Sequence, residues 1–326
     1  MTPVAVTLER HQVVLCLAAI AGGAAVGILA PATAPVVAPA ITPVIALLLF
    51  ATFLGVPFRT LGAALRDTRF AGTVLAVNFL VVPLVVFVLS RAVAADEAAL
   101  VGVLLVLLTP CVDYVIVFAG LAGGARDKLL AATPLLMVMQ ILLLPLYLLL
   151  MAGPAVVGAF DLRPFVEAFL LLIALPLGAA VLVQLGARRV RAVARIQDAA
   201  TTAMVPLMML TLAVVVASQI ADVAGRAGAL LAVVPVYLAF AAVMVPLGIV
   251  AGRVAGLAVP ERRAVVFSGV TRNSLVVLPL ALALPAGFAL TPLVVVTQTL
   301  VELVAMVVLV AVVPRLVRHP SSTPPA

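Results

Sequence analysis

The chain has 326 residues, of which 66% are apolar and 10% are charged, and its formal net charge is +7. So few polar residues cannot cover the surface of a water-soluble fold of this length, so the composition excludes a soluble globular protein and indicates a membrane protein.

Ten apolar runs follow one another along the chain, and each is long enough to cross the hydrocarbon core of a bilayer as a helix. The first run contains Gly23-x-x-x-Gly27, a spacing that predicts close helix packing. The sequence therefore predicts an all-α polytopic membrane protein with ten transmembrane helices, followed by a disordered C-terminal tail at 319–326. The ten runs cover residues 12–30, 36–56, 70–90, 98–122, 129–152, 165–186, 200–220, 229–252, 264–285 and 290–314.

Cationic side chains are divided very unevenly between the two sides of this predicted bundle. One side carries only Arg91, Arg163 and Arg226. Because Lys and Arg are retained on the cytoplasmic side, we expect both termini to be cytoplasmic. Cleavage of the first run as a secretory signal would reverse this division of charge, so we expect the run to be retained. We expect the protein to lie in the cell membrane (plasma or inner). The positive charge is thus a topology signal, and no nucleic-acid partner is expected. The cation-rich side carries Arg10, Arg59, Arg66, Arg69, Arg126, Lys128, Arg188, Arg189, Arg191, Arg195, Arg253, Arg262, Arg263, Arg315 and Arg318.

Two similar segments lie half a chain apart. LAVNFLVVPL at 75–84 and LAFAAVMVPL at 238–247 match at five positions and fall in the third and eighth apolar runs. Each half holds five runs, an odd number, so the second half must enter the membrane in the opposite direction. The sequence therefore predicts two inverted five-helix repeats, residues 1–157 and 158–318, which is the usual plan of secondary transporters.

Charged residues inside the apolar runs are few. A charge at the centre of a membrane helix costs about 2.5–3.5 kcal/mol on insertion scales, so such residues normally face a cavity or a partner. Asp113 lies beside Pro110 in the fourth run, and Arg272 lies in Thr-Arg-Asn-Ser in the ninth. We predict that spans 4 and 9 are discontinuous, with Pro110 as the helix break in span 4, that they cross, and that Asp113 and Arg272 pair there. A simple proline kink, with a charge pair that only holds the two halves together, is the alternative.

Several kinds of chemistry are excluded or disfavoured. The two cysteines, Cys16 and Cys111, both lie in predicted spans, so neither a disulfide framework nor a CxxC metal site is expected. The two histidines, His11 and His319, lie near the termini, which leaves no usual general base in the membrane. No phosphate-binding GxxxxGK[ST] loop occurs. We therefore expect no cofactor, no metal and no enzymatic activity, although an intramembrane enzyme or a non-transporting membrane subunit stays open as another class.

At these residues the sequence resembles the bile acid:sodium symporter superfamily and, within it, the arsenical-resistance (arsenite efflux) permeases. VNFLVVPLVVFVLS at 77–90 resembles the third-helix pattern of the superfamily. PCVDYVIVFAGLAGG at 110–124 resembles the permease pattern in which a cysteine opens the second half of helix 4, and LVELV at 300–304 resembles the Leu-x-Glu of helix 10. The resemblance implies substrate contact for Cys111, a role for Glu302, and a core of spans 3–5 and 8–10 that faces a panel of spans 1, 2, 6 and 7.

The chain departs from both branches of the superfamily. A guanidinium beside a sodium site would repel the ion, so the resemblance implies a proton rather than sodium as the coupling ion. The positions that match the sodium ligands of sodium-coupled members carry Ser268, Arg272, Val115 and Ile116. The positions that differ from the usual arsenite permeases carry Asp113, Tyr114 and Leu275.

The thiol of Cys111 suits a soft trivalent arsenic or antimony species, although a small buried apolar residue is the plain alternative. Glu302, and after it Asp113, could carry the coupling proton, while Asn78, Asn273 and Ser274 are expected to line the substrate site with Asp113 and Arg272. We therefore predict a secondary active transporter in the lipid bilayer, an antiporter that exports arsenite or a related metalloid oxyacid against protons. The alternative is sodium-coupled uptake of a small organic anion, with Arg272 holding its carboxylate or sulfonate.

Overall fold

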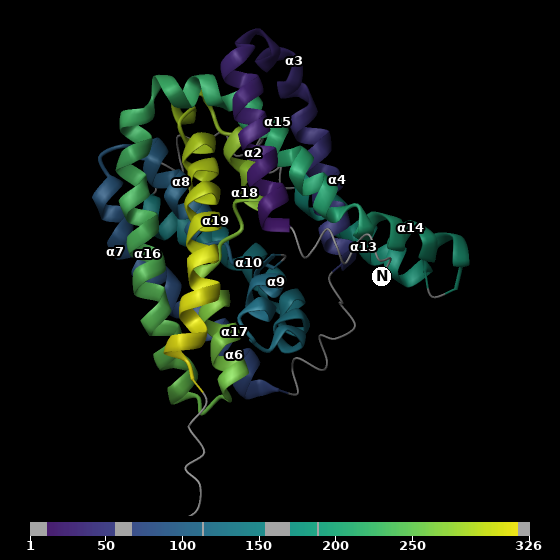
Figure 1. Ribbon diagram of the computed structural model, residues 1–326, viewed down its shortest axis with the longest axis vertical. Coiled ribbons are helices and arrows are strands. Elements are labelled where there is room, and N and C mark those ends of the chain that lie inside the picture. Colours follow the sequence, from purple (N-terminus) through teal and green to yellow (C-terminus); the bar gives the residue numbers. More distant parts are fainter. Residues whose placement is uncertain (1–11, 56–66, 113, 154–169, 188, 319–326) are drawn as a thin grey trace, which may run out of the picture.

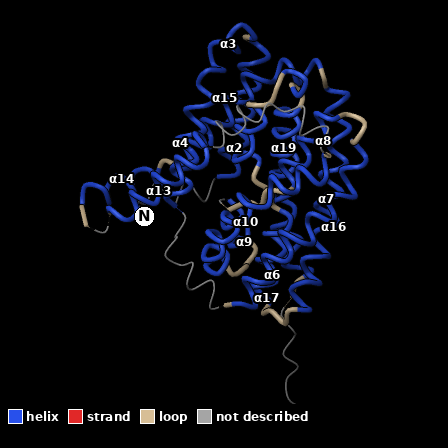
Figure 2. Tube along the Cα trace, turned by 180° about the vertical axis from the view of Figure 1, so that it is seen from behind, coloured by secondary structure: helices blue, strands red, loops and turns tan. Residues whose placement is uncertain are grey.

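The computed structural model describes residues 12–55, 67–112, 114–153, 170–187 and 189–318, and no extended strand occurs among them. Where the structure describes the residues between successive helices, those connections are short (Figure 2). In chain order they are α2 (Gln12–Leu29), η1 (Pro31–Thr33), α3 (Ala34–Val37), η2 (Ala38–Ala40), α4 (Ile41–Gly55), α6 (Thr68–Ala76), η4 (Val77–Val81), α7 (Val82–Ser90), η5 (Arg91–Val93), α8 (Glu97–Leu107), α9 (Tyr114–Leu121), α10 (Arg126–Ala152), η6 (Leu170–Ala174), α13 (Leu175–Gly186), α14 (Arg191–Thr202), α15 (Met204–Gly225), α16 (Ala227–Val254), α17 (Val259–Val270), α18 (Ser274–Leu282), η7 (Ala286–Phe288) and α19 (Thr291–Leu316).

The prediction of an all-helical polytopic membrane protein is confirmed. Within the described residues, five helical segments are long and apolar enough to cross a membrane, and α14 with α15 form a bent pair that would make a sixth. The predicted tail at 319–326 and the predicted boundary near residue 157 lie outside the described residues. The five segments are Pro31–Gly55, Thr68–Val93, Arg126–Ala152, Gly228–Val254 and Thr291–Leu316.

One of the described helices lies almost entirely outside the predicted apolar runs. Helix α14 carries Arg191, Arg195 and Asp198 and meets α15 at an angle of 47°. A search for apolar runs misses such a helix, because its apolar side chains occupy only one face.

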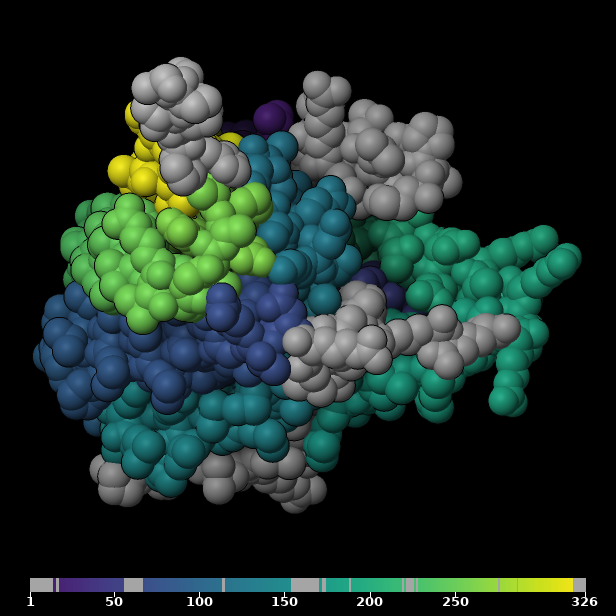
Figure 3. All heavy atoms as spheres, turned by 90° about the horizontal axis from the view of Figure 1, so that it is seen from below, coloured from purple at the N-terminus to yellow at the C-terminus, as the bar shows by residue number. Residues whose placement is uncertain are grey.

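The helices pack in two groups (Figure 1). In one group α2 lies along α15, and α4 contacts α13, α14 and α15; in the other, α16 packs on α17 and α19, and α8 packs on α10, α18 and α19. Seen from below, the segment that carries α13 and α14 extends to one side, away from the second group (Figure 3). The grouping agrees with the panel and core that the family resemblance implies.

The glycine pair in α2 explains its close packing on α15. A Cβ atom at Gly23 would lie 2.5 Å from the Ala213 carbonyl oxygen, and one at Gly27 would lie 2.6 Å from the Ala217 carbonyl oxygen. Only glycine permits this approach of two backbones, as in other membrane helix pairs with small residues four apart. The predicted packing role of Gly23-x-x-x-Gly27 is confirmed.

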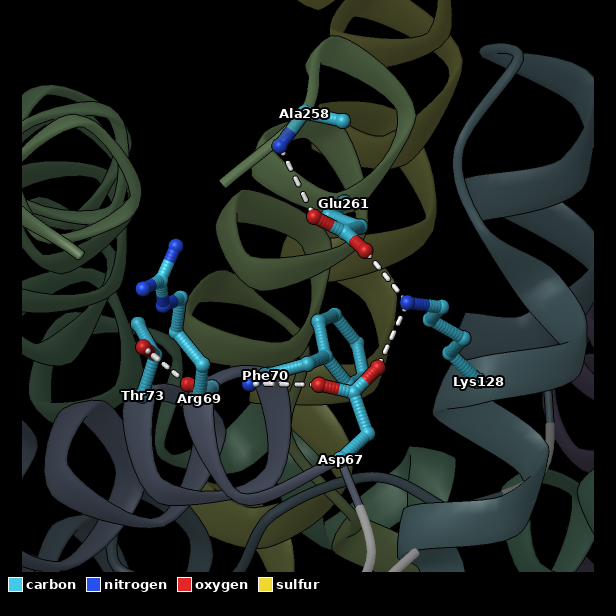
Figure 4. Close-up of polar contacts among 7 residues, drawn as sticks. All are labelled: Asp67, Arg69, Phe70, Thr73, Lys128, Ala258 and Glu261. Atoms are coloured by element: carbon cyan, nitrogen blue, oxygen red, sulfur yellow. Dashed lines mark hydrogen bonds and ion pairs between the residues drawn. The ribbon is translucent and has the colours of Figure 1, made fainter. Parts of the chain in front are cut away.

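Lys128 joins the N-terminal ends of three helices in the second group (Figure 4). Its Nζ lies 2.5 Å from Asp67 Oδ2 and 2.5 Å from Glu261 Oε1. Asp67 caps α6 by accepting a bond from the Phe70 N–H at 3.2 Å, and Glu261 accepts one from the Ala258 N–H at 2.8 Å at the start of α17. Both carboxylates therefore also complement the positive end of a helix dipole.

Arginine side chains close helix C-termini in the same group. Arg263 donates from Nε and Nη2 to the Val317 carbonyl at 3.1 and 2.9 Å, and from Nη1 to the Ala122 carbonyl at 3.0 Å. These carbonyls follow α19 and α9, where the last turns lack intrahelical donors. The guanidinium supplies those donors and the favourable charge.

We predict that Lys128→Met lowers the stability of the purified protein by about 1 kcal/mol or less, because exposed ion pairs are screened by solvent. The bond from Lys128 lowers the pKa of Asp67 below its ordinary value of 3.8. With a lowered folded-state pKa, the contribution of Asp67 is present above its unfolded pKa and is lost as the pH falls through the folded value. In thermal unfolding, the loss of stability of Lys128→Met relative to the wild type should therefore be the same from about pH 8 to about pH 5.

Arg126→Met is the matched control, because Arg126 is exposed and makes only a long ion pair, 3.9 Å, with the adjacent residue Asp127. An equal deficit in this control would contradict the specific role of Lys128.

Candidate functional site

Two interrupted helices cross in the interior of the second group. Helix α8 ends at Leu107 and α9 begins at Tyr114, while α17 ends at Val270 and α18 begins at Ser274. The residues between them form an isolated antiparallel bridge that pairs Pro110 with Arg272. The predicted interruptions in these two helices, and their crossing, are confirmed.

Backbone groups at the crossing bond across it rather than along their own helices. The Cys111 N–H donates to the Thr271 carbonyl at 3.2 Å, and the Asn273 N–H donates to the Thr109 carbonyl at 2.9 Å. The Arg272 N–H donates to Glu302 Oε2 at 2.8 Å. Pro110 has no N–H that would need a partner. Non-helical backbone is tolerated at membrane depth where protein buries and satisfies it in this way.

These three diversions free three carbonyl groups. In a continuous helix, each N–H would have bonded the carbonyl four residues earlier. Because the N–H groups of Cys111, Arg272 and Asn273 bond elsewhere, three carbonyls lose their helical partners. These are the carbonyls of Leu107, Ser268 and Gly269.

The Arg272 side chain supplies the missing donors. Nη2 lies 2.6 Å from the Ser268 carbonyl and 2.8 Å from the Gly269 carbonyl, and Nη1 lies 3.3 Å from the Leu107 carbonyl. The side chain is 0% exposed, and its guanidinium carbon lies 5.5 Å from the centre of the Phe240 ring. The charge thus also meets the negative ends of α8 and α17 and the face of an aromatic ring.

Asn78 adds a side-chain acceptor to these carbonyls. Its Oδ1 lies 2.8 Å from Arg272 Nη2, and its Nδ2 donates at 2.9 Å both to the Val74 carbonyl and to Ser268 Oγ. Asn78 lies in the π-helical turn η4, shortly before Pro83. A π turn of this kind is frequent at functional sites, and here it brings the predicted residue Asn78 into contact with Arg272.

Glu302 reaches the crossing from α19. Its Oε2 accepts bonds from the Arg272 N–H and from Gln298 Nε2, and the side chain is 5% exposed. The Oε1 atom of Gln298 is buried and accepts no hydrogen bond from the described residues. The carboxyl group is thus placed against the backbone of the crossing, beside an amide that could accept as well as donate.

Cys111 lies in the bridge itself but its sulfur is not open to a cavity. The residue is 1% exposed. Thr271, whose carbonyl accepts the bond from the Cys111 N–H, contacts another sulfur through its side chain: Thr271 Oγ1 lies 3.5 Å from Met306 Sδ. Substrate contact through Cys111 would require its sulfur to be open to the central cavity, and the structure contradicts that in this conformation, because the residue is buried.

Asn273 and Ser274, which are also predicted to line the substrate site, lie at the start of α18. Asn273 caps the helix by accepting a bond from the Val276 N–H at 3.2 Å, and Ser274 Oγ lies 2.6 Å from Thr299 Oγ1. Ser274 and Thr299 border a cavity of about 10 Å³ that apolar residues of α15 close on the other side. That volume holds about one water molecule, so this cavity is too small for a larger solute in the present conformation.

Asp113 lies outside the described residues, so its predicted pairing with Arg272 stays a prediction. Sequence reasoning missed Phe240, Met306 and Thr299, which carry no charge and belong to apolar runs. One signal was available for Phe240: it lies in the repeated segment 238–247, next to the position that matches Asn78 in the first half.

We predict that Asn78→Leu lowers the stability by about 2 kcal/mol, because it removes an acceptor from a buried guanidinium. Asn78→Asp keeps an acceptor oxygen of the same size and should lose less. The measurement is the apparent melting temperature of each purified variant in detergent. Equal melting temperatures for both variants would show that the contact with Arg272 contributes little.

A comparison with protein families places this architecture. The model described as the Sodium Bile acid symporter family matches residues 42–226, which is more than half of the chain and includes the interruption at Cys111. No match was found among curated proteins. The chain therefore belongs to the Sodium Bile acid symporter family, and it is an integral multi-pass membrane protein and a membrane transporter of that type.

Proposed function

We propose that the chain is a proton-coupled secondary transporter of the cell membrane, an antiporter that exports arsenite or a related metalloid oxyacid. The observation that carries the coupling is the position of Arg272, whose guanidinium bonds the carbonyls of Leu107, Ser268 and Gly269. Backbone carbonyls at a helix interruption are groups that hold a coupling cation in many secondary transporters. Here a fixed cation already occupies them, which favours a proton as the coupling ion.

Glu302 is the proposed proton carrier, with Asp113 as a second candidate. Among the residues whose burial the structure describes, Glu302 is the one buried carboxyl group. It bonds the Arg272 N–H, so gain or loss of its proton would change the hydrogen bonding of the crossing directly. A buried carboxyl tied to a helix interruption is thus suited to link proton binding to a change in the shape of the crossing.

The metalloid assignment rests on sulfur chemistry. Cys111 lies in the bridge, and the Met306 thioether contacts the same Thr271. Soft thiolate and thioether groups favour soft acceptors such as trivalent arsenic. The proposed site also includes Asn78, Arg272, Asn273 and Ser274, which could hydrogen-bond the hydroxyl or oxyanion groups of an oxyacid.

We further propose the architecture expected from the sequence: ten transmembrane helices in two inverted repeats, residues 1–157 and 158–318, with both termini in the cytoplasm. The interrupted pair α8 and α9 in the first half and the interrupted pair α17 and α18 in the second half support this plan. So does the joining of α6, α10 and α17 by Lys128 on the side that the cations predict to be cytoplasmic.

Sodium-coupled uptake of an organic anion is the second candidate, and the family match favours it. In that case Arg272 would hold the carboxylate or sulfonate of the substrate. The four neutral oxygens that already surround its guanidinium weigh against this role. A non-transporting membrane subunit is a third and weaker candidate.

We expect Cys111→Ser to abolish arsenite resistance in an arsenite-sensitive host, because the change keeps the size and replaces a soft sulfur by a hard oxygen. Cys16→Ser, in α2, is the matched control and should leave resistance unchanged. Membrane yield of both variants is measured alongside. Full resistance in cells that carry the Cys111 variant would remove the main chemical support for a metalloid substrate.

Glu302→Gln should separate coupling from substrate binding. The glutamine carbonyl can still accept the bond from the Arg272 N–H, but the side chain no longer titrates. In vesicles with separately imposed gradients, the wild type should move labelled arsenite under a proton gradient, equally in sodium and in choline buffer. The variant should lose proton-driven transport and retain exchange of labelled for unlabelled arsenite.

A steep sodium dependence of the wild-type rate, or transport of a taurocholate-like anion in place of arsenite, would favour the second candidate. Proton-driven transport by the Glu302 variant would exclude Glu302 as the carrier.

A further inference from the structure

Four oxygen atoms converge on the Arg272 guanidinium from three separate helical segments. They belong to the carbonyls of Leu107, Ser268 and Gly269 and to the Asn78 side chain, and three of them lie 2.6–2.8 Å from Nη2. Each of these four atoms is an acceptor without a proton of its own. We call these four oxygens and the Phe240 ring the acceptor cage.

We propose that Arg272 is a tethered ligand of the acceptor cage, and that the cage without it is a binding site for a free guanidinium cation. The side chain then occupies its site as a resident cation, and no soluble cation is needed at the crossing. This inference deepens the proposed sodium-independent coupling by identifying what stands in place of a coupling cation, but it concerns binding alone and does not depend on which solute is transported.

The geometry favours a planar cation that donates hydrogen bonds. The guanidinium group is flat and carries several N–H donors in fixed directions. Here Nη1 bonds the Leu107 carbonyl, and the two N–H groups of Nη2 serve the remaining three oxygens, so at least one N–H is shared between two acceptors, while the guanidinium carbon lies 5.5 Å from the Phe240 ring centre. A spherical metal ion could use the oxygens, but it carries no N–H groups and could not form the hydrogen bonds that a planar donor makes there. The cage is therefore expected to select guanidinium-type cations.

Because the acceptor cage is buried, its oxygens are costly to leave without a hydrogen-bond donor. Asn78, Ser268 and Arg272 are all 0% exposed. Removal of the guanidinium would leave buried acceptors without donors, which is costly in a protein interior. The negative ends of α8 and α17 would also lose their compensating charge. A small cation that restores both should bind the altered protein and stabilise it.

Arg263 provides an internal comparison. It also donates to backbone carbonyls, those of Ala122 and Val317, but it is only part-buried. Water can reach the carbonyls that an Arg263 variant would expose, so a free cation should bring little benefit there.

The test uses purified full-length Arg272→Ala in detergent, without any substrate, and measures its melting temperature against millimolar methylguanidinium. We expect a rise of about 3 °C at saturation, with no rise for the wild type or for Arg263→Ala. Tetramethylammonium, which has the charge but no N–H donors, should have no effect. Equal stabilisation by the two cations, or none by methylguanidinium, would overturn the proposal.

If Arg272→Ala does not fold, Arg272→Gln is used in its place. It also removes the charge and the guanidinium nitrogens, but it leaves a smaller cavity. The same methylguanidinium titration then applies, with the same two outcomes. Arg272→Lys keeps a tethered cation and should be unaffected by methylguanidinium, and stabilisation of this variant equal to that of Arg272→Gln would also contradict a tethered ligand. These results stay informative if arsenite is not transported, because no step of the assay uses a transported solute.

Discussion

The crossing of α8–α9 with α17–α18 depends on one constraint: backbone polar groups buried in a membrane protein must all find partners within the protein. Interruption of two helices frees carbonyls in both. The N–H groups of Cys111, Arg272 and Asn273 bond across the crossing or to Glu302, and the Arg272 guanidinium takes up the three carbonyls left behind. A single side chain thus makes a non-helical crossing compatible with the membrane interior.

This arrangement has consequences for function. Because the guanidinium is fixed by backbone groups of both helix pairs, a change in either interruption alters its bonds in the other. Glu302 bonds the backbone of the same residue, so a proton on its carboxyl group would act at the point where the two helix pairs meet. In contrast, the N-terminal ends of three helices in this group are held by Lys128, and the C-terminal ends of α9 and α19 by Arg263. These surface ties therefore link helices of this group to one another, away from the crossing.

Much of the fold could be predicted from the sequence, because apolar runs of membrane length leave little choice of structure. The interruptions could be predicted as well: Pro110 disrupts a helix by itself, and Thr-Arg-Asn-Ser places polar groups where a continuous helix would meet lipid or packed side chains. The environment of Arg272 could not be predicted, because three of its four oxygen partners are backbone carbonyls, and any residue carries one. Helix α14 was not predicted, because its apolar residues do not form a continuous run. The burial of Cys111 depends on tertiary packing around the crossing, which no local pattern encodes.

The central claim is that Arg272 is the resident cation of the crossing. The most direct measurement is a cryo-electron microscopy map of the protein in lipid nanodiscs, at a resolution that defines side chains, recorded in sodium and in choline buffer. The account predicts the same guanidinium position in both, in contact with Asn78 and with the carbonyls of Leu107, Ser268 and Gly269. Density for a bound ion at those carbonyls in sodium alone, with the Arg272 side chain turned away from them, would contradict it.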